Sequence, residues 1–512
     1  MPIRMVEDND NQNSNNNNPP ERKKGSGGAG NIVGMLLPLF LRNPKLALIV
    51  LVLGGGYFLF QKGCSSGAPD QQTQSSYATG CEMKREVYDS AEVFAALSDK
   101  EKLPDQVSLQ RFCPTPQNQG QQGSCVGWGS AYAARTILQA VATGENPNQI
   151  AFSPSFLYNQ IGLEGCQGSY INRAMDNMKH TGAMPYRDFP YDENSCDKLP
   201  NSYELQDASK FKMKGYNRLT LNGDDFTVDM QAMKQNLAQG APVVVGMSVG
   251  GTFMREMEGQ ESWIPSNEDY EKNGFGGHCM CVVGYDEFLN GGSFQLMNSW
   301  GTAWGNKGFA WVRYKDFEYF CNEAYGIYPL AKSGAVANET RLNCSIGLIE
   351  KESGNYVALQ NQTQNLFSTL RPLTKGTKFK VEVSNSIECY TYVFAQDTDK
   401  SSYVLFPYTP KHSAYCGITG TRIFPRDYSM LVDAIGTKDF MAIVVSKNPI
   451  DYKAINNAIN NFQASTYVDK INGVLAAELI PAVGFTTNQK VNFECDTKSK
   501  NAVALVIEVD KR

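Results

Sequence analysis

The most apolar stretch of the chain runs through residues 32–60 and is interrupted at residues 42–45. Within it, residues 46–61 carry no charge, but these 16 residues are short for a helix that needs about 20 residues to cross a bilayer. Lys45 and Lys62 flank the run, and their long side chains can reach the membrane surfaces. The pattern predicts one N-terminal transmembrane helix within a membrane anchor at residues 32–62.

The segments on either side of this anchor differ in charge and composition. Residues 1–31 are rich in Asn, Gly and charge without apolar periodicity, which predicts a disordered tail. Basic residues precede the anchor, so the tail is expected in the cytoplasm and the rest of the chain outside, in the periplasm or extracellular space. A cleaved signal peptide is the alternative, disfavoured by the long tail and the lack of an Ala-x-Ala site. Residues 63–102 are expected to form a linker and a short pro-segment.

From residue 103 the pattern is that of a compact α+β domain. Residues 126–141 have helical spacing, and Gly144 is placed to end that helix. Residues 225–238 predict a second helix. Short apolar runs at residues 242–247, 279–285 and 309–314 predict buried strands, and we assign residues 103–332 to this domain.

A shift to small and polar residues at 331–338 predicts a domain boundary. Beyond it, Phe379, Val381 and Val383 alternate with charged residues, as in a half-buried strand. Further strands are expected at residues 403–406 and 441–445, and helices at 452–462 and 473–479. Residues 339–512 are therefore expected to form a separate β-rich accessory domain.

Composition limits the function classes. The net charge of -5 comes without a basic stripe, so nucleic-acid binding has little support. None of the 13 cysteines forms a CxxC pair, so no metal site is expected, and no cofactor either. Cysteines spread singly over so long a chain favour an oxidising compartment and disulfides. Because their number is odd, at least one thiol stays free, and Cys125 is the candidate.

Three distant positions supply the parts of a nucleophilic site. Cys125 opens the predicted helix at 126–141, and a helix N-terminus favours the thiolate. His278, one of three histidines in the chain, begins a strand-like run and can act as a base. Asn298 can orient that imidazole, and Gln119 carries a carboxamide able to hold an oxyanion. Each of these residues, taken alone, can be explained by a purely structural role. The prediction of a nucleophilic site therefore rests on their combination.

Four ordered segments resemble the papain-like cysteine peptidases: residues 119–128 (QGQQGSCVGW), 165–169 (GCQGS), 277–285 (GHCMCVVGY) and 298–309 (NSWGTAWGNKGF). The resemblance covers residues 103–330 and implies a helical subdomain, a β-barrel-like subdomain and a cleft between them. Together with the anchor and the C-terminal region, it suggests a bacterial, membrane-anchored type with an extra β-rich domain.

The resemblance also implies roles. Cys125 attacks the scissile carbonyl, His278 pairs with the thiolate and protonates the leaving amine, Asn298 orients His278, and Gln119 binds the oxyanion. Substrate contacts are expected from Gly168, Ser169, Tyr170, Ile171, Gly246, Gly277, Cys279, Trp300 and Trp304. Because Tyr170, Ile171, Gly246 and Cys279 would line the pocket for the second residue before the cleaved bond, an apolar or aromatic preference is expected there.

The chain departs from the family pattern in several places. Gln122 stands where the family usually has a cysteine that pairs with the glycine-loop cysteine, so Cys166 must pair elsewhere, and Cys196 is the expected partner. Val126 replaces the usual tryptophan, and Ser169 replaces the second glycine of the loop. The usual long prosegment does not fit before residue 103, so either residues 82–102 block the cleft or control lies elsewhere.

These observations favour a membrane-anchored cysteine endopeptidase that hydrolyses peptide bonds through an acyl-enzyme. One alternative is an acyl-enzyme transpeptidase, in which an amine replaces water. Another is a non-catalytic binding or scaffold protein that uses a peptidase fold. The expected partners are protein or peptide substrates, the membrane, and a protein bound by the C-terminal domain.

Overall fold

The computed structural model describes residues 3–7, 77–93, 97–98, 102–221, 226–330, 340–426 and 428–512. Buried apolar side chains form one large cluster built mainly by residues 81–327. A second cluster is built by residues 342–509 together with Ile3. The predicted boundary at 331–338 lies outside the described residues, so the division into two domains stays a prediction.

One long helix runs through the peptidase-like region, as its spacing predicted. It consists of α4 (Cys125–Gly127), the π-helical segment η3 (Trp128–Arg135) and α5 (Thr136–Thr143), and it ends at Gly144 with φ of 76°. A left-handed residue of this kind stops a helix at little cost only when it is glycine. The helix is almost wholly buried, so its first residue lies inside the domain.

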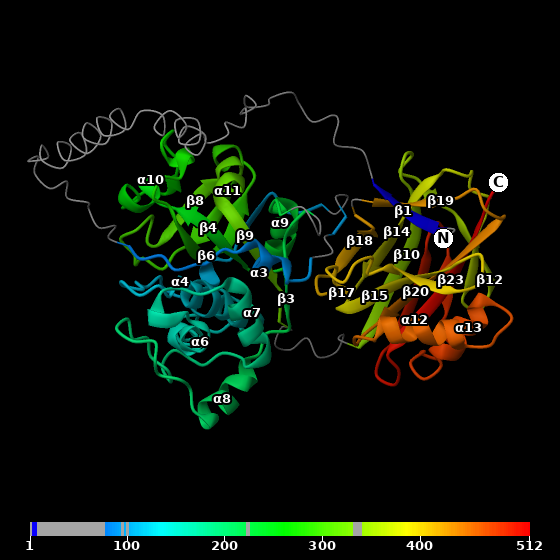
Figure 1. Cartoon of the computed structure of the whole chain (residues 1–512), viewed down its shortest axis with the longest axis horizontal. Helices are drawn as coiled ribbons and strands as arrows, with labels where there is room; N and C mark the ends of the chain where they lie inside the picture. Colours follow the sequence, from blue (N-terminus) through cyan, green and yellow to red (C-terminus); the bar gives the residue numbers. More distant parts are fainter. Residues whose placement is uncertain are drawn as a thin grey trace, which may run out of the picture. The chain divides into compact units, whose positions relative to one another are not determined.

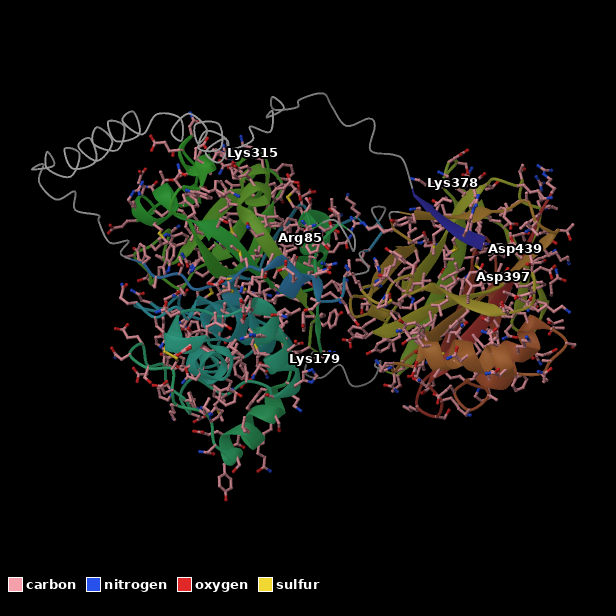
Figure 2. All side chains as sticks on the ribbon, in the orientation of Figure 1. Arg85, Lys179, Lys315, Lys378, Asp397 and Asp439 are labelled. Carbon is pink, nitrogen blue, oxygen red and sulfur yellow. A yellow bond between two sulfur atoms is a disulfide. The ribbon has the colours of Figure 1, made fainter. Side chains whose placement is uncertain are left out.

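Further helices complete this region: α3 (Arg85–Asp89), α6 (Pro154–Ile161), α7 (Ile171–His180), α8 (Ser202–Ala208), α9 (Met230–Ala238), α10 (Gly251–Arg255) and α11 (Tyr314–Phe320). Lys179 and Lys315 lie on the exposed sides of α7 and α11 (Figure 2), opposite faces that pack inward. The helix predicted at 225–238 begins later, because Asp229 caps the backbone N–H of Ala232.

A sheet forms the other part of the region, with the strand order β3-β9-β4-β6-β7-β8-β5 and β2 paired to β6. The strands are β2 (Gln106–Ser108), β3 (Tyr216–Arg218), β4 (Val243–Val249), β5 (Ser262–Trp263), β6 (Gly276–Asp286), β7 (Ser293–Met297), β8 (Phe309–Arg313) and β9 (Cys321–Ile327). Figure 1 shows α4, α6 and α7 on one side of this region and the strands on the other. This region therefore combines helices with a mixed sheet, as expected for an α+β domain, and the three predicted strands are confirmed.

The C-terminal region is β-rich, as expected. One sheet has the order β1-β19-β14-β10-β22-β21, with β11 and β18 at its sides, and the other has the order β12-β13-β23-β20-β15-β16, with β17 beside β15. The first sheet contains β1 (Ile3–Glu7), β10 (Arg341–Glu350), β11 (Tyr356–Val357), β14 (Lys378–Asn385), β18 (Gly420–Phe424), β19 (Tyr428–Val432), β21 (Phe485–Thr487) and β22 (Val491–Asp496). The second contains β12 (Leu359–Thr363), β13 (Leu366–Thr369), β15 (Cys389–Gln396), β16 (Ser402–Phe406), β17 (Tyr415–Cys416), β20 (Lys438–Ser446) and β23 (Ala502–Asp510).

Successive side chains of a strand point to opposite faces of the sheet, and apolar side chains cover both faces of this second sheet. Met441, Ile443 and Val445 of β20 belong to the core shared with the first sheet. Ala442 and Val444, which point the other way, pack against α12 (Tyr452–Asn461) and α13 (Tyr467–Val474). The strands expected at 379–383, 403–406 and 441–445 and the helix at 452–462 are confirmed, whereas the helix expected at 473–479 is wrong, because α13 ends at Val474.

The N-terminal segments differ from expectation where they are described. Residues 3–7, assigned to a disordered tail, form β1, which pairs antiparallel with β19. Within residues 82–102 only α3 is helical among the described positions. The predicted membrane anchor at 32–62 lies outside the described residues, and no helix in the described ranges is long and apolar enough to cross a membrane.

The disulfide pattern is sparse. Cys166 and Cys196 are bonded, which confirms the expected pairing. Ten other described cysteines are unpaired, and nine of them are buried. Cys125 is free, as expected, but it is one of ten free thiols among the described residues. Cys279 and Cys281 of β6 are core thiols.

Candidate active site

Cys125 begins the long helix, with its thiol completely buried. The positive end of the helix and a backbone group of Cys279 within hydrogen-bonding range both favour the thiolate. Burial outweighs them and raises the pKa of Cys125 to about 12. In the state seen here the nucleophile candidate is thus a neutral thiol beside the strand that carries His278.

His278 and Asn298 are brought together by neighbouring strands. His278 lies near the start of β6, and Asn298 follows β7 directly. The His278 Nε2 and the Asn298 Oδ1 are 2.7 Å apart, and since the oxygen can only accept, Nε2 carries the hydrogen. The Nδ1 atom is buried and has no hydrogen-bond partner in the described structure. Burial lowers the pKa of His278 to about 4, partly offset by Asn298.

Trp300 covers this contact. Its ring stacks on the His278 imidazole with ring centroids 4.3 Å apart, and only 1% of its surface is exposed. Trp304 packs edge-on against Trp300 at 5.8 Å and donates its indole N–H to the carbonyl of Phe253. The two tryptophans therefore exclude water from the His278–Asn298 hydrogen bond, which strengthens it.

Gln119 is held rigidly next to the same elements. Its Oε1 accepts a hydrogen bond from the Ser299 hydroxyl at 2.7 Å, and its Nε2 donates to the carbonyl of Gln122 at 2.9 Å. Its backbone N–H also donates to the carbonyl of Ser299. An amide nitrogen carries two hydrogens, so one remains for a further acceptor.

Gln122, the departure from the family pattern, is used for hydrogen bonding. Its Nε2 donates to the carbonyl of Asp192 at 3.2 Å, and its Oε1 accepts from the Tyr191 hydroxyl at 3.2 Å. The same hydroxyl also contacts the carbonyl of Gln119 at 2.7 Å. The glycine loop itself is held by the Cys166–Cys196 disulfide and by the backbone N–H of Gly123, which donates to the carbonyl of Cys166 at 3.2 Å.

An extended segment at residues 77–83, here called the strap, covers the site. The backbone N–H groups of Gly80 and Cys81 donate to the carbonyl of Gly277 at 3.1 and 3.0 Å. Glu82 donates to the carbonyl of Ser169, and Ser169 donates to the carbonyl of Gly80, both at 2.9 Å. Gly277 and Ser169 are residues expected to bind substrate, so the strap occupies their hydrogen-bonding groups.

The strap also reaches the aromatic side of the site. Tyr77 stacks on Trp300 at 4.7 Å, and the Trp300 indole N–H donates to the carbonyl of Ala78 at 2.9 Å. The strap comes so close to Gly277 and Gly168 that only glycine fits at these two positions. A Cβ on Gly277 would lie 2.0 Å from the Cys81 oxygen, and a Cβ on Gly168 would lie 2.6 Å from the Gly80 oxygen.

The predicted pocket residues gather around the end of the strap. A Cβ on Gly246 would lie 3.0 Å from the Met83 sulfur and 3.3 Å from Ile171 Cδ1. Cys279 is the β6 partner of Gly246 across the sheet. Tyr170 is the residue before α7, with its ring 4.9 Å from the Arg173 guanidinium. Met83 therefore fills the pocket that was assigned to a substrate side chain.

Two features of the site escaped the sequence analysis. Glu323 on β9 is a buried acid paired with Gly246 across the sheet, and its only signal in the sequence is a single charge in an apolar strand. The strap itself has no motif, and the segment expected to block the cleft was placed at 82–102 rather than 77–83.

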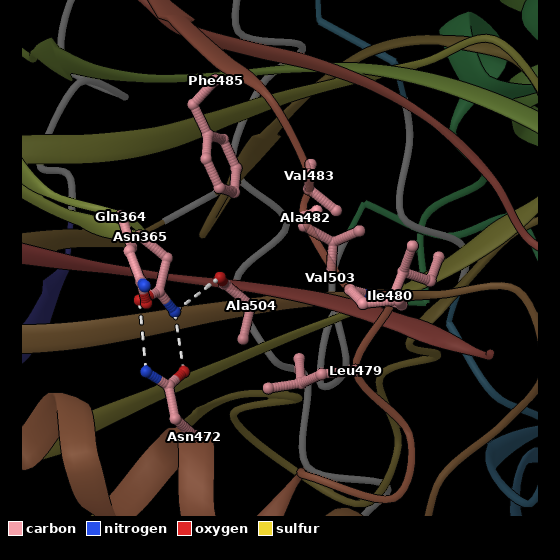
Figure 3. Close-up of a pocket in the computed structure, with 11 residues that line it drawn as sticks. Gln364, Asn365, Asn472, Leu479, Ile480, Ala482, Val483, Phe485, Val503 and Ala504 are labelled. Atoms are coloured by element: carbon pink, nitrogen blue, oxygen red, sulfur yellow. Dashed lines mark hydrogen bonds between the residues drawn. The ribbon is translucent and has the colours of Figure 1, made fainter.

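A cavity of about 380 Å³ lies in the C-terminal region (Figure 3). The amides of Asn365 and Asn472 lie together on one side of it and exchange hydrogen bonds of 2.8 and 3.2 Å. The remaining lining is mostly apolar, including Leu479 and Phe485. Because none of its described lining residues is an acid, a base or a nucleophile, this cavity does not compete with Cys125 as a catalytic centre.

Comparison with known families agrees with this geometry. Residues 103–328 match the model described as papain family cysteine protease. This region is similar to papain-family cysteine proteases. The papain-family match covers all four motif segments, which supports a hydrolase. The match ends before the β-rich C-terminal region.

Individual relatives show the same pattern. An uncharacterised peptidase C1-like protein of Acanthamoeba polyphaga mimivirus is 29% identical over 231 residues, or 42% of this chain and 71% of its own length. Cathepsin K of Mus musculus is 25% identical over 215 residues, and pro-cathepsin H of Bos taurus is 28% identical over 201 residues. These matches span 41% and 39% of this chain but only 59% and 55% of the two cathepsins. Among solved structures, xylellain, a cysteine protease from Xylella fastidiosa, is 21% identical with a TM-score of 0.41, over 50% of this chain and 96% of its own.

Proposed function

We propose that the protein is a cysteine endopeptidase that hydrolyses peptide bonds through Cys125, His278 and Asn298. The observation that carries the proposal is the 2.7 Å contact of His278 Nε2 with Asn298, which leaves the buried Nδ1 unpaired on the strand beside Cys125. A free imidazole nitrogen in this position can take the thiol proton and return it to the leaving amine.

The steps follow from the groups present. The Cys125 sulfur adds to the scissile carbonyl carbon as its proton passes to His278 Nδ1. The negative oxygen that forms accepts hydrogen bonds from the Gln119 Nε2 and the Cys125 backbone N–H. The carbon–nitrogen bond breaks as His278 protonates the amine, and water then attacks the thioester and releases the acid product.

In the described state the enzyme is latent. The strap takes the backbone partners that a substrate needs, and burial leaves Cys125 and His278 neutral at pH 7, with pKa values of about 12 and about 4. Departure of the strap would readmit water and substrate, and solvation would again favour the thiolate–imidazolium pair. The strap thus does what the usual long prosegment of the family, which does not fit before residue 103, would do.

The catalytic proposal is tested in a full chain whose strap is released by Gly80→Val. Adding Cys125→Ala should abolish hydrolysis of a fluorogenic peptide, whereas Cys495→Ala, which removes a free thiol of the C-terminal region, should not. Equal hydrolysis with Cys125→Ala would refute the peptidase proposal and favour the scaffold alternative. Adding a primary amine and finding it in the product would favour transpeptidation instead.

Attachment to the cell membrane is a further proposal, based on the apolar run at residues 46–61 and the basic residues before it. The pairing of β1 with β19 bears on the topology, because residues 3–7 can pair with Tyr428–Val432 only on one side of a membrane. Protease protection of N- and C-terminal tags in intact cells tests this. Opposite protection supports a single-pass arrangement with a cytoplasmic tail, and equal protection supports the strand pairing.

For the C-terminal region we propose a role in recruiting a protein substrate or partner. Truncation after Ala337 should then reduce cleavage of folded protein substrates more than cleavage of short peptides. Equal effects on the two substrate types, or none, would argue against recruitment.

A further inference from the structure

Two buried free thiols of the C-terminal region face each other across one pair of strands. Cys389 begins β15 and Cys416 ends β17, and the two residues are direct partners in the antiparallel register. Each has at most 1% of its surface exposed, and both lie in the apolar core shared by the first and second sheets. The catalytic steps proposed above use neither of them.

The strand register holds the two backbones at a distance that a disulfide can span. The backbone N–H of Thr391 donates to the carbonyl of Ala414 at 2.9 Å, so the ladder is formed right beside the pair. Opposite residues of antiparallel strands have Cα atoms about 4.5–5.5 Å apart, and a disulfide needs about 4.4–6.8 Å. Register partners also point to the same face of the sheet. The Cys389 thiol accordingly lies within hydrogen-bonding range of the Cys416 sulfur.

The surroundings of the pair distinguish the two sulfurs. The hydrogen bond from the Cys389 thiol holds the pKa of Cys416 below its usual value; burial opposes this, and the buried Arg422 guanidinium supports it. The Thr391 hydroxyl lies 3.6 Å from the Cys416 sulfur and can donate to it. The pKa of Cys389 is raised by the shared hydrogen bond and by burial. Cys416 is therefore the better nucleophile of the pair.

A third thiol of the same core, Cys344, is less well placed for a bond to either sulfur. It belongs to β10 in the first sheet, where its register partners are Asn385 and Phe493. Sheets that pack face to face lie about 10 Å apart, so a bond from Cys344 would have to cross between them. The strands β15 and β17, in contrast, are hydrogen-bonded neighbours in one sheet.

We propose that Cys389 and Cys416 form a disulfide when the protein meets an oxidising small-molecule disulfide. Because β17 is only two residues long, its local opening can admit the oxidant while the two sheets stay folded. The Cys416 thiolate attacks one sulfur of the oxidant and expels the other as a thiolate, which leaves a mixed disulfide. Cys389 then loses its proton, and its sulfur attacks the Cys416 sulfur and expels the second thiolate. Two protein thiols are oxidised, and the small disulfide is reduced to two thiols.

The bond has consequences for stability and for the place where the protein works. It would close a loop slightly shorter than the one closed by Cys166 and Cys196, which are 30 residues apart, and would tie β17 to the second sheet. The cytosol keeps thiols reduced, whereas compartments outside the cytoplasmic membrane form disulfides. A bond between Cys389 and Cys416 in protein taken from cells would therefore support a location outside the cytoplasm, independently of the apolar run at residues 46–61.

The first test maps the bonds in the purified full chain. The reduced protein is incubated with oxidised glutathione in denaturant below its unfolding transition, where local opening is frequent. Free thiols are then blocked with N-ethylmaleimide, and linked peptides are identified by mass spectrometry. We expect a linked pair that contains Cys389 and Cys416. If the Cys166–Cys196 link forms and this one does not, or if either cysteine is linked to Cys344, the proposal is wrong.

Thermal unfolding gives a second readout. Reduction removes the bonds of both Cys389 and Cys166 from the oxidised parent, but only the second bond from Cys389→Ser. It should therefore lower the Tm of the parent by at least about 5 °C more than that of the variant. Cys344→Ser, which changes another buried thiol of the core, should lose as much as the parent. Equal losses in the parent and Cys389→Ser would contradict the bond; if Cys389→Ser does not fold, Cys416→Ala replaces it in the comparison.

Discussion

The strap makes a specific prediction at Gly80, which crosses the site with φ of +144°. A Cβ at this position would lie 2.2 Å from the carbonyl oxygen of Gly123, a backbone atom that cannot move aside easily. Gly80→Val should therefore expel the strap while leaving the residues of the site unchanged. The expected result is a gain of peptidase activity in the full-length protein.

The size of the effect follows from the contacts that valine would break. Two backbone N–H groups, those of Gly80 and Cys81, and the carbonyl of Gly80 form hydrogen bonds with Gly277 and Ser169. Three such bonds contribute about 1 kcal/mol each. A branched residue held at this φ costs about 2 kcal/mol more. Together these terms amount to about 5 kcal/mol, which shifts the closed–open equilibrium by roughly 10³-fold or more.

The assay is hydrolysis of a short fluorogenic peptide by the purified full chain. Because activity stops rising once the strap is fully open, we expect kcat/KM to increase by at least about 10²-fold. Thr79→Val is the matched control, since it places a side chain of the same shape next to Gly80 without adding volume. Equal activity of the parent, Gly80→Val and Thr79→Val would refute the reasoning that the strap blocks the site.

Three further predictions follow from the same contacts. In the strap-released chain, Gln119→Ala should lower kcat by about 10²–10³-fold with a smaller change in KM, because it removes an oxyanion donor; an effect on KM alone would contradict that role. Burial raises the pKa of Glu323 to about 8 with the strap closed, and water that enters when the strap opens should lower it, so a proton is taken up on closure and the closed form is destabilised as pH rises toward about 8. The activity of the parent relative to Gly80→Val should accordingly rise between pH 5 and about 8, and a constant ratio would show that Glu323 is not coupled to the strap. Cys196→Ser opens a disulfide that joins residues 30 apart, so thermal or denaturant unfolding should show a loss of about 3 kcal/mol; an unchanged midpoint would mean that Cys166 and Cys196 are not bonded in solution.

The residues proposed for catalysis could be located in the sequence because each belongs to a local pattern. Cys125 opens a helix whose spacing and terminal glycine are visible in the sequence, and His278 and Asn298 lie at the ends of apolar runs that form β6 and β7. The pairing of Cys166 with Cys196 was likewise expected from the absence of the usual partner at Gln122. For Cys125, His278 and Asn298 the local element already places the side chain.

The features that were missed depend on contacts between distant segments. The strap has no regular pattern of its own, and its position is set by hydrogen bonds to Gly277 and Ser169. Residues 3–7 look like part of a polar tail, yet they pair with an edge strand more than 400 residues away. Glu323 reaches the pocket only through strand register. Pairing of this kind leaves little trace in either segment alone.

The most direct test of the central claim is to identify which thiol carries the activity. The strap-released chain is treated at about pH 6 with limiting iodoacetamide, and alkylation of each cysteine is followed by mass spectrometry alongside peptide hydrolysis. Because the helix N-terminus and His278 favour its thiolate once water enters, Cys125 should be alkylated first, with activity falling in proportion. Loss of activity while Cys125 remains unmodified, or full activity after its complete alkylation, would contradict the account.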